Sequence, residues 1–290
     1  MSGQPRPSVV VGVDGSLDGW IALEWAARHA TLRHLELRGV HVVDESRPAQ
    51  PLGSSPGQDD GTEVLEDAAD ELARIGYQGA KLEIRYGNPA EVLLDLSRDA
   101  SLLVIGRRGA GGFAELVLGS TSQVCAALVR TALVVVPDTW RPDEPDRGRI
   151  VVGVDGSPSC QAALAFGFAL ASTRRAELEV VHVSDVPEAF PRPDVWLDPD
   201  EPPWRAGAEL LVAEALANWT EKYPEVVVRT RFCAGHPVQV LGRASHTADL
   251  VVVGGLGRTR FSPLRMGSVA RGLLHHSRSP VAVVHNEEQV

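Results

Sequence analysis

The stretch Leu102-Leu-Val-Ile-Gly-Arg-Arg-Gly109, followed after nine residues by Gly119-Ser-Thr-Ser122, decides the fold of this chain. Its first four residues are a short apolar run of the kind that forms a buried strand. Glycines follow the run, and small hydroxyl residues then open a helical stretch. A strand, a glycine-rich loop and a helix N-terminus in this order predict a phosphate site, because backbone N–H groups and the helix dipole face the anion.

The same pattern recurs in the second half of the chain. The apolar run Leu250–Val253 is followed by Gly254 and Gly257, and nine residues later by Gly267 and Ser268. A single loop of this kind would be weak evidence for a phosphate site. Two copies at one spacing make the prediction specific.

The repeat extends well beyond the glycines. Residues 9–16 and 150–157 share the run Val-Val-Gly-Val-Asp-Gly-Ser and lie 141 residues apart. Gly87-Asn-Pro89 and Gly235-His-Pro237 lie 148 residues apart, so the second copy holds seven additional residues. The Pro- and Asp-rich stretch 187–204 is the expected place for them. A repeat of this size is a whole domain rather than a solenoid element.

Length agrees with two domains. The 290 residues fit two units of the commonest domain size. We predict a first domain at 1–138, a Pro- and charge-rich linker at 139–148 and a second domain at 149–290.

Strand and helix patterns alternate within each half. In the first half we expect strands at 8–13, 36–43, 81–86, 102–105 and 132–136, with helices at 17–33, 63–75, 89–98 and 120–129. Such alternation predicts an α/β protein with helices on both faces of a parallel sheet. The predicted fold is two tandem open-twisted five-stranded Rossmann-like sheets, each with the strand order 3-2-1-4-5.

Composition and charge exclude several classes of function. A net charge of −10 argues against non-specific nucleic-acid binding, which requires a basic surface. No segment has the apolar length of a membrane span, and the N-terminus lacks a signal-like apolar core. We therefore expect a cytoplasmic protein that binds neither nucleic acid nor membrane. Of the three cysteines, Cys125 is expected in the core and Cys160 to be partly exposed, with a redox role left open.

The spacing Gly-x2-Gly-x9-Gly-Ser, present in both halves, resembles the ATP-binding motif of the universal stress protein family in its tandem form. The resemblance covers 8–138 and 149–286. It implies a nucleotide-binding regulatory protein of the stress response that holds up to two ATP molecules per chain, with Mg²⁺ on the phosphates. A slow ATPase or nucleotidyl-transfer relative of the same fold is the alternative, and a degenerate module that only mediates assembly is a third.

The nucleoside is expected beyond the ends of the first two strands of each half. Asp14 and Asp155 follow the first strand and could accept hydrogen bonds from adenosine, while Gly12 and Gly153 would let it come close. By resemblance, Asp14 and Asp155 contact the nucleoside, and the backbones of Val42 and Val183 pair with adenine. The alternative is that Asp-Gly-Ser is only turn and helix-cap chemistry. His41 and His182, which precede these valines, are expected to be structural.

The resemblance also assigns the phosphate cradles. The first consists of Gly106, Gly109, Gly111, Gly112, Gly119, Ser120, Thr121 and Ser122, and the second of Gly254, Gly257, Arg258, Arg260, Gly267, Ser268 and Val269. The two cradles are not equivalent. The first has Ala110 where the family usually has a basic residue, and the second lacks hydroxyls at Val269 and Ala270. Arg258 and Arg260 suit phosphate oxygens, although they could instead be a solvated loop face.

Other features bear on catalysis and assembly. The chain has no Gly-Lys-Ser/Thr motif, and its two lysines, Lys81 and Lys222, lie outside the loops, so fast phosphoryl transfer is not expected. The apolar stretches 132–136 and 280–284 are each the last strand of a domain. Because an exposed apolar edge invites pairing, we expect the two halves to pair within the chain, and a homodimer is a further possibility.

Overall fold

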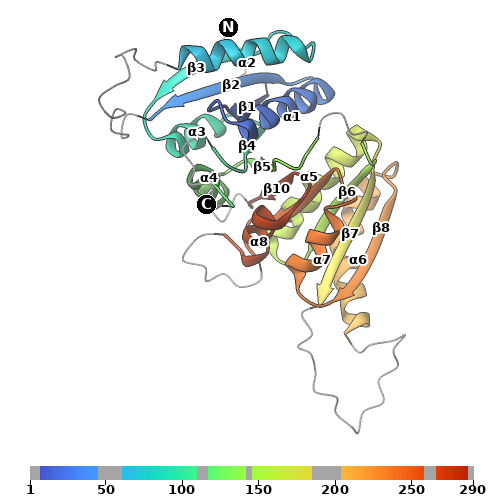
Figure 1. Ribbon diagram of the computed structural model, residues 1–290. Coiled ribbons are helices and arrows are strands. Elements are labelled where there is room, and N and C mark those ends of the chain that lie inside the picture. The colour runs from blue at the N-terminus through green and yellow to red at the C-terminus, as the bar shows by residue number, and fades with distance from the viewer. Residues whose placement is uncertain are drawn as a thin grey trace. The chain divides into compact units, whose positions relative to one another are not determined.

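The computed structural model describes residues 7–44, 61–109, 117–141, 146–184, 204–257 and 266–286. Four residues of the predicted cradles, Gly111, Gly112, Arg258 and Arg260, lie outside these ranges, as does most of the stretch 187–204. The chain divides into two compact units, Met1–Pro145 and Asp146–Gln289 (Figure 1).

The two units have the same order of elements. The first contains β1 (Ser8–Gly12), α1 (Leu17–Arg33), β2 (Glu36–Val43), α2 (Thr62–Arg74), β3 (Lys81–Tyr86), α3 (Pro89–Ser97), β4 (Leu102–Gly106), α4 (Ser120–Leu128) and β5 (Ala132–Val136). The second contains β6 (Arg149–Val154), α5 (Pro158–Arg174), β7 (Glu177–Ser184), α6 (Arg205–Lys222), β8 (Val228–Ala234), α7 (Pro237–Ala244), β9 (Leu250–Gly254), α8 (Ser268–His276) and β10 (Val281–Val284).

Each unit is built on a parallel sheet. The order is β3-β2-β1-β4-β5 in the first unit and β8-β7-β6-β9-β10 in the second. In the first, Val11 pairs with Gly39 of β2 on one side and with Val104 of β4 on the other. The predicted fold class and strand order are confirmed. In the first unit, the expected bounds of strands and helices agree with the structure to within one residue at each end.

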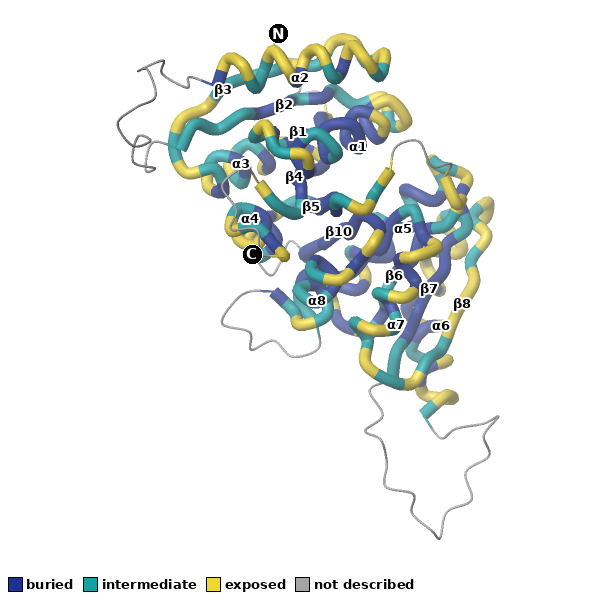
Figure 2. The backbone as a smooth tube through the Cα atoms, in the orientation of Figure 1, coloured by how far each residue is buried: buried dark blue, intermediate teal, exposed yellow. Residues whose placement is uncertain are grey.

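The central strands are buried because helices cover both faces of the sheet. Val9, Val10 and Val11 of β1 are fully buried. Helix α1 packs on β1 and β4 and contacts α2, while α3 packs on β1 and contacts α4. Figure 2 shows the central strands as buried and the edge strand β3 as intermediate to exposed, whereas α2 buries only Ala68 and Leu72 and exposes its outer face. Burial on both faces explains the continuous apolar runs of these strands.

Helix starts are set by local chemistry. Ser16 caps α1, and its side chain accepts a hydrogen bond from the Gly19 amide at 3.0 Å. Asn88 caps α3 through the Ala90 amide at 3.0 Å, with Pro89 in the first turn. These caps satisfy amides that have no acceptor inside the helix. They also fix the turns that follow β1 and β3.

Two of the cysteines lie in the core. Cys125 is buried, as predicted, and burial raises the pKa of its thiol to about 12. The prediction that Cys160 is partly exposed is wrong, because only 1% of it is accessible. It lies on α5 with Ala163 and Leu164, which are also buried, so the helix turns it toward the sheet. Burial also raises the pKa of the Cys160 thiol.

In the part of the chain that the structure describes, no helix combines the length and apolar character needed to cross a membrane.

Candidate functional site

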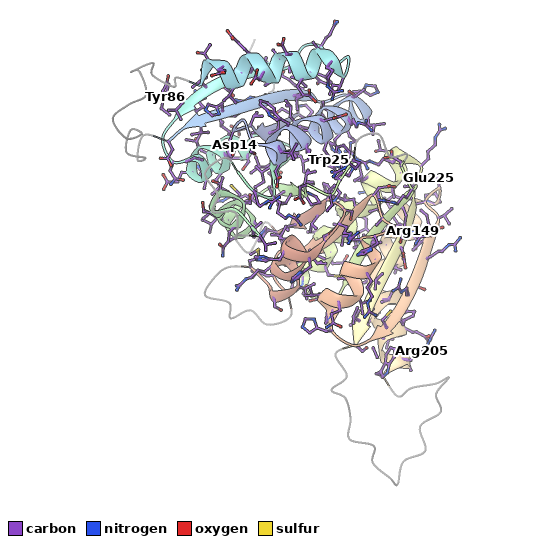
Figure 3. The ribbon with its side chains drawn as sticks, viewed as in Figure 1. Asp14, Trp25, Tyr86, Arg149, Arg205 and Glu225 are labelled. Atoms are coloured by element: carbon purple, nitrogen blue, oxygen red, sulfur yellow. The ribbon has the colours of Figure 1, made fainter. Side chains whose placement is uncertain are left out.

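The predicted site residues gather where β1 and β4 end. These strands are neighbours, and the strand order reverses between them: β2 and β3 lie on one side of β1, whereas β4 and β5 lie on the other. Such a point of reversal at the carboxyl ends of parallel strands is where open α/β sheets bind ligands. Asp14 lies at this edge (Figure 3).

Asp14 uses its two carboxylate oxygens differently. Oδ1 accepts hydrogen bonds from the amide of Ser16 at 3.1 Å and from its hydroxyl at 2.5 Å. Oδ2 faces Gly109, and a Cβ atom on Gly109 would overlap it. The turn chemistry that the sequence offered as an alternative is therefore present, but it occupies Oδ1, and Oδ2 points to the loop 106–109.

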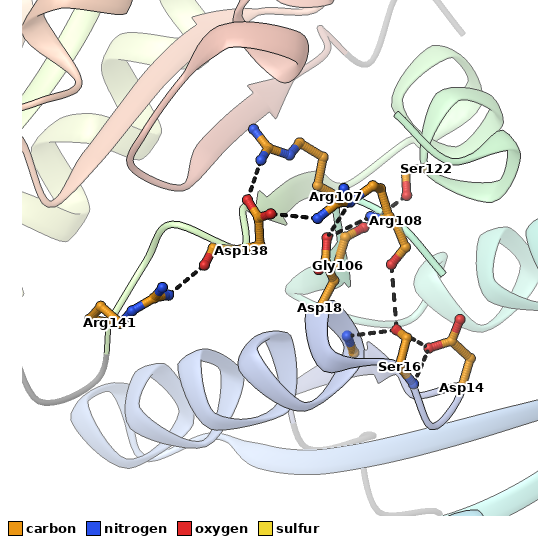
Figure 4. A network of polar contacts seen from close by, with 10 residues as sticks. Asp14, Ser16, Asp18, Gly106, Arg107, Arg108, Ser122, Asp138 and Arg141 are labelled. Atoms are coloured by element: carbon orange, nitrogen blue, oxygen red, sulfur yellow. Dashed lines mark hydrogen bonds and ion pairs between the residues drawn. The ribbon is translucent and has the colours of Figure 1, made fainter. Parts of the chain in front are cut away.

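The phosphate loop of the first unit is closely packed at its glycines. A Cβ atom on Gly106 would lie 2.7 Å from the backbone carbonyl of Asp18. The amide of Gly119 donates to the carbonyl oxygen of Arg107 at 2.9 Å, which joins the loop to the start of α4. The structure thus brings Gly106, Gly109 and Gly119 together (Figure 4 shows the neighbouring polar contacts).

The N-terminus of α4 faces the same loop. Gly119 is its N-cap and makes no side-chain cap bond. The amides of Ser120, Thr121 and Ser122 have no acceptor within the helix, because the first intrahelical bonds begin one turn later. These amides and the helix dipole could together stabilise an anion at this end of the helix.

Ser122 has a structural role that the sequence did not indicate. Its hydroxyl is buried and donates to the carbonyl oxygen of Gly106 at 2.8 Å. Ser120 is exposed and Thr121 half-buried, so these two hydroxyls remain on the open side. In the second unit the buried Ala270 takes the place of Ser122. The missing hydroxyl there removes a contact within the loop rather than a contact with a ligand.

A network of charged residues fixes the first loop. The backbone amide of Arg108 donates to Oδ2 of the buried Asp18 at 3.0 Å. Arg107 and Arg108 both pair with Asp138, which follows β5 (Figure 4). Neither Asp18 nor Asp138 was predicted from the sequence to belong to the site. The adjacent Arg107 and Arg108 were a signal for nearby acidic partners, but only the fold brings Asp18 and Asp138 to them.

In β2, the strand next to β1, the backbone of Val42 is directed toward the space beyond the end of β1. The carbonyl oxygen of Val43 accepts from the Gly87 amide on the β3 side, so the Val42 carbonyl points the other way, toward β1. The β1–β2 register ends at Gly12 and Val40, so Val42 extends past the paired part of β1. In the second unit the Ser184 carbonyl accepts from the Gly235 amide, so the Val183 carbonyl points toward β6 in the same way.

Gly12 and Gly153 have a packing explanation. A Cβ atom on Gly12 would lie 2.9 Å from Cδ1 of Leu93, and one on Gly153 would lie 3.0 Å from Cδ1 of Leu241. These leucines belong to α3 and α7. The space beside both glycines is therefore occupied by a helix side chain.

The second unit repeats the contacts that Asp14 and the loop glycines make in the first. Oδ1 of Asp155 accepts from the Ser157 amide at 2.9 Å, and Oδ2 lies 3.3 Å from where a Cβ on Gly257 would be. Gly267 donates to the Gly255 carbonyl at 2.7 Å, and a Cβ on Gly254 would lie 2.7 Å from Cβ of Ser159. Ser268 is exposed and Val269 half-buried.

No metal cluster accompanies these loops in the described ranges. Among those residues, no three His, Cys, Asp or Glu side chains are grouped so that they could hold a metal ion. The first amides of α4 and α8 could donate hydrogen bonds to an anionic ligand.

Comparisons with known proteins agree with the fold. The family model described as "Universal stress protein family" matches residues 6–137 and 147–285. A universal stress protein of Mycobacterium tuberculosis (strain H37Rv) is 35% identical over 291 residues, which cover 95% of this chain and 96% of that protein. One from Mycolicibacterium smegmatis is 32% identical over 287 residues, with 95% and 96% covered.

A solved structure shows the same fold. The universal stress protein from Archaeoglobus fulgidus is similar with a TM-score of 0.66 over 96% of each chain, at 20% sequence identity. Because the family model matches both halves and the relatives extend over nearly the whole length, this chain belongs to the universal stress protein family and carries two of its domains in tandem.

Proposed function

We propose that each unit binds one ATP molecule at the carboxyl edge of its sheet, and that the chain acts as a nucleotide-dependent regulatory protein of the stress response. One observation carries the proposal: Oδ2 of Asp14, the backbone at Gly109 and the N-terminus of α4 converge at the same edge. Asp155, Gly257 and α8 repeat the arrangement.

The nucleoside end of the proposed site uses β1 and β2. The backbone groups of Val42 face the space beyond β1 and would pair with the edge of adenine. Asp14 supplies a carboxylate beside that space, able to accept hydrogen bonds from ribose hydroxyls. In the second unit, Val183 and Asp155 would do the same.

The phosphate end uses backbone amides rather than lysines. The amide of Gly109 and the first amides of α4 would donate to phosphate oxygens, and the helix dipole would add favourable charge. A Mg²⁺ ion held by the phosphate oxygens would offset the remaining charge. These backbone amides, together with a cation carried by the ligand, would therefore suit a triphosphate.

The positions of the lysines favour holding ATP over hydrolysing it. Lys81 is in β3, where it pairs with Glu36 at 2.6 Å, and Lys222 is in the last turn of α6 beside Trp219. Rapid phosphoryl transfer requires a cation on the leaving group and a group that orients the nucleophile. ATP would instead act as a ligand that stabilises one conformation of the chain.

The decisive experiment is mass spectrometry of nucleotide released from native purified chain, quantified per chain. We expect ATP at up to two per chain and no phosphate release above that of buffer. The variant Asp14→Ala/Asp155→Ala should carry none. Asp95→Ala, which removes a carboxylate from an exposed position on α3, serves as the control and should carry the wild-type amount.

Three results would count against this proposal. Native chain that carries no adenine nucleotide, and does not bind added ATP with or without Mg²⁺, would refute it. Retention of nucleotide by Asp14→Ala/Asp155→Ala would refute the site. Sustained phosphate release that is lost in the same variant would favour the slow ATPase instead.

A further inference from the structure

The first phosphate loop carries an ion-pair network that the second lacks. We propose that Asp18 and Asp138 are positioning residues that clamp loop 106–109, so that nucleotide binding in the first unit depends on the clamp and binding in the second does not. This inference rests on the proposed function, because it concerns how the same site is held ready for its ligand.

The backbone of the loop is held by hydrogen bonds to residues at the starts of two helices. From α1, Oδ2 of Asp18 accepts the Arg108 amide at 3.0 Å, directly before Gly109. From α4, the Gly119 amide donates to the Arg107 carbonyl at 2.9 Å. Only 6% of the Asp18 side chain is exposed, so water competes little for its hydrogen bonds. Both bonds hold the same peptide group, the one between Arg107 and Arg108, which is therefore fixed before any ligand arrives.

The side chains of the two arginines add ion pairs to these backbone bonds. Nη2 of Arg107 pairs with Oδ1 of Asp138, and Nη2 of Arg108 pairs with Oδ2 of the same carboxylate. Nε of Arg108 also lies 3.5 Å from Oδ2 of Asp18. Asp138 follows β5, so the loop is tied to the end of the neighbouring strand. Partly buried ion pairs of this kind are screened by salt less than surface pairs.

The charges of this network cancel. Two arginines face two aspartates, so the network adds no net positive charge for the phosphates of ATP. Its effect is then geometric: it holds the Gly109 amide in place and lowers the ordering cost of binding. This distinguishes a clamp from a set of phosphate-binding arginines.

The second unit provides an internal comparison. Its residues at the positions of Arg107, Arg108, Asp18 and Asp138 are Gly255, Leu256, Ser159 and Asn286, none of them charged. The backbone bond from α8 is kept, since Gly267 donates to the Gly255 carbonyl at 2.7 Å. The ring of His285 occupies the space beside Gly255. The second loop therefore retains the backbone bond from its last helix without the ion pairs of the first loop.

The test is an ATP titration by calorimetry in which each site is isolated. With Asp155→Ala silencing the second site, Asp138→Asn should raise the dissociation constant of the first site roughly tenfold, because a charge-assisted bond is lost. With Asp14→Ala silencing the first site, the matched change Asn286→Ala should leave the second site within about twofold of its value.

A measurement without nucleotide separates this inference from the proposed function. Hydrogen exchange of the amides in 106–109 should be faster in Asp138→Asn than in the wild type, with exchange in 254–257 unchanged. If the wild-type chain bound no ATP, the proposed function would fail, and the exchange rates would still decide whether the clamp exists. Unchanged exchange together with unchanged affinity would overturn the clamp.

Two further outcomes decide its mechanism. Tighter ATP binding in Asp138→Asn would overturn the inference, because it would mean that Asp138 withholds arginines that bind phosphate. At Asp18, an asparagine keeps an oxygen that accepts the Arg108 amide, whereas an alanine does not. Asp18→Ala should therefore weaken first-site binding more than Asp18→Asn, and equal effects would argue against backbone positioning.

Discussion

The Nδ1 atom of His41 lies 2.8 Å from the carbonyl oxygen of Val13, the residue directly before Asp14. His182 makes the same contact with Val154, also at 2.8 Å. Because a carbonyl can only accept, Nδ1 carries the proton in this contact. Each histidine thus ties the end of the first strand of its unit to the second strand, beside the proposed nucleoside site.

We expect His41→Ala to destabilise the chain by about 1 kcal/mol, the usual net value of one hydrogen bond, and to weaken ATP binding at the first site severalfold. His41→Asn, whose side-chain amide can still donate, should lose less of both. Urea unfolding and calorimetric titration measure the two effects. The exposed His246 supplies a control, since His246→Ala should change neither.

The double variant Asp14→Ala/Gly109→Ala should lose ATP binding in the first unit and keep its fold. Removing the carboxylate makes room for the new Cβ at position 109, because Asp14 is the residue that this Cβ would overlap. Titration should then give one ATP per chain in place of two, with an unchanged circular dichroism spectrum. A stoichiometry of two would show that the site has been assigned to the wrong residues.

Thiol labelling should distinguish the three cysteines. Cys233 is half-buried, whereas Cys125 and Cys160 are buried and their thiol pKa values are raised by burial. At neutral pH in the native state, an alkylating reagent should therefore modify Cys233 first, and the other two only after unfolding. Peptide mass spectrometry would locate the label, and early modification of Cys160 would contradict the burial described here.

The raised pKa of Cys125 also predicts a pH effect. Its thiol stays protonated in the folded state up to about 12, from an ordinary value of 9.0, so the unfolded chain releases this proton first as pH rises. The free energy of unfolding should therefore fall above pH 9. The stability that the buried Cys125 thiol contributes should be fully present below that pH. Cys125→Ala should show a shallower decline between pH 9 and 10 in urea unfolding.

The ends of α1 and α5 offer a route to higher stability. His34 and Arg175 follow these helices with φ values of 53° and 51°, a left-handed conformation that favours glycine. His34→Gly and Arg175→Gly should each stabilise the chain by up to about 1 kcal/mol. Arg33→Gly, one residue earlier and inside α1, should destabilise it by a similar amount. Thermal unfolding would test the opposite signs.

The sequence allowed the elements of the fold to be predicted because their signals are local. Buried parallel strands appear as apolar runs, and caps such as Ser16 and Asn88 mark where helices begin. Strand order followed from the alternation of elements and from the family resemblance. The glycine that precedes α4 also has a direct structural role, because the Gly119 amide donates to the Arg107 carbonyl in the loop.

The remaining features depend on contacts between distant parts of the chain. Asp138 meets Arg107 only because β5 ends beside β4, and no short-range pattern indicates that meeting. The sequence suggested that Gly12 lets a ligand approach, while the structure shows Leu93 beside it. The burial of Cys160 was missed because the face that α5 turns to the sheet is set by packing rather than by its distance from a turn.

The approach of Asp14 to Gly109 restricts the order in which these two positions can change. An alanine at position 109 meets the carboxylate of Asp14, so it fits without rearrangement only where residue 14 has already been shortened, and otherwise the carboxylate must move away. In the second unit the matching contact is 3.3 Å, between Oδ2 of Asp155 and a Cβ on Gly257. A small shift would accommodate that Cβ, so Asp155 and Gly257 can be substituted in either order. The two halves of one chain are therefore free to diverge at different rates.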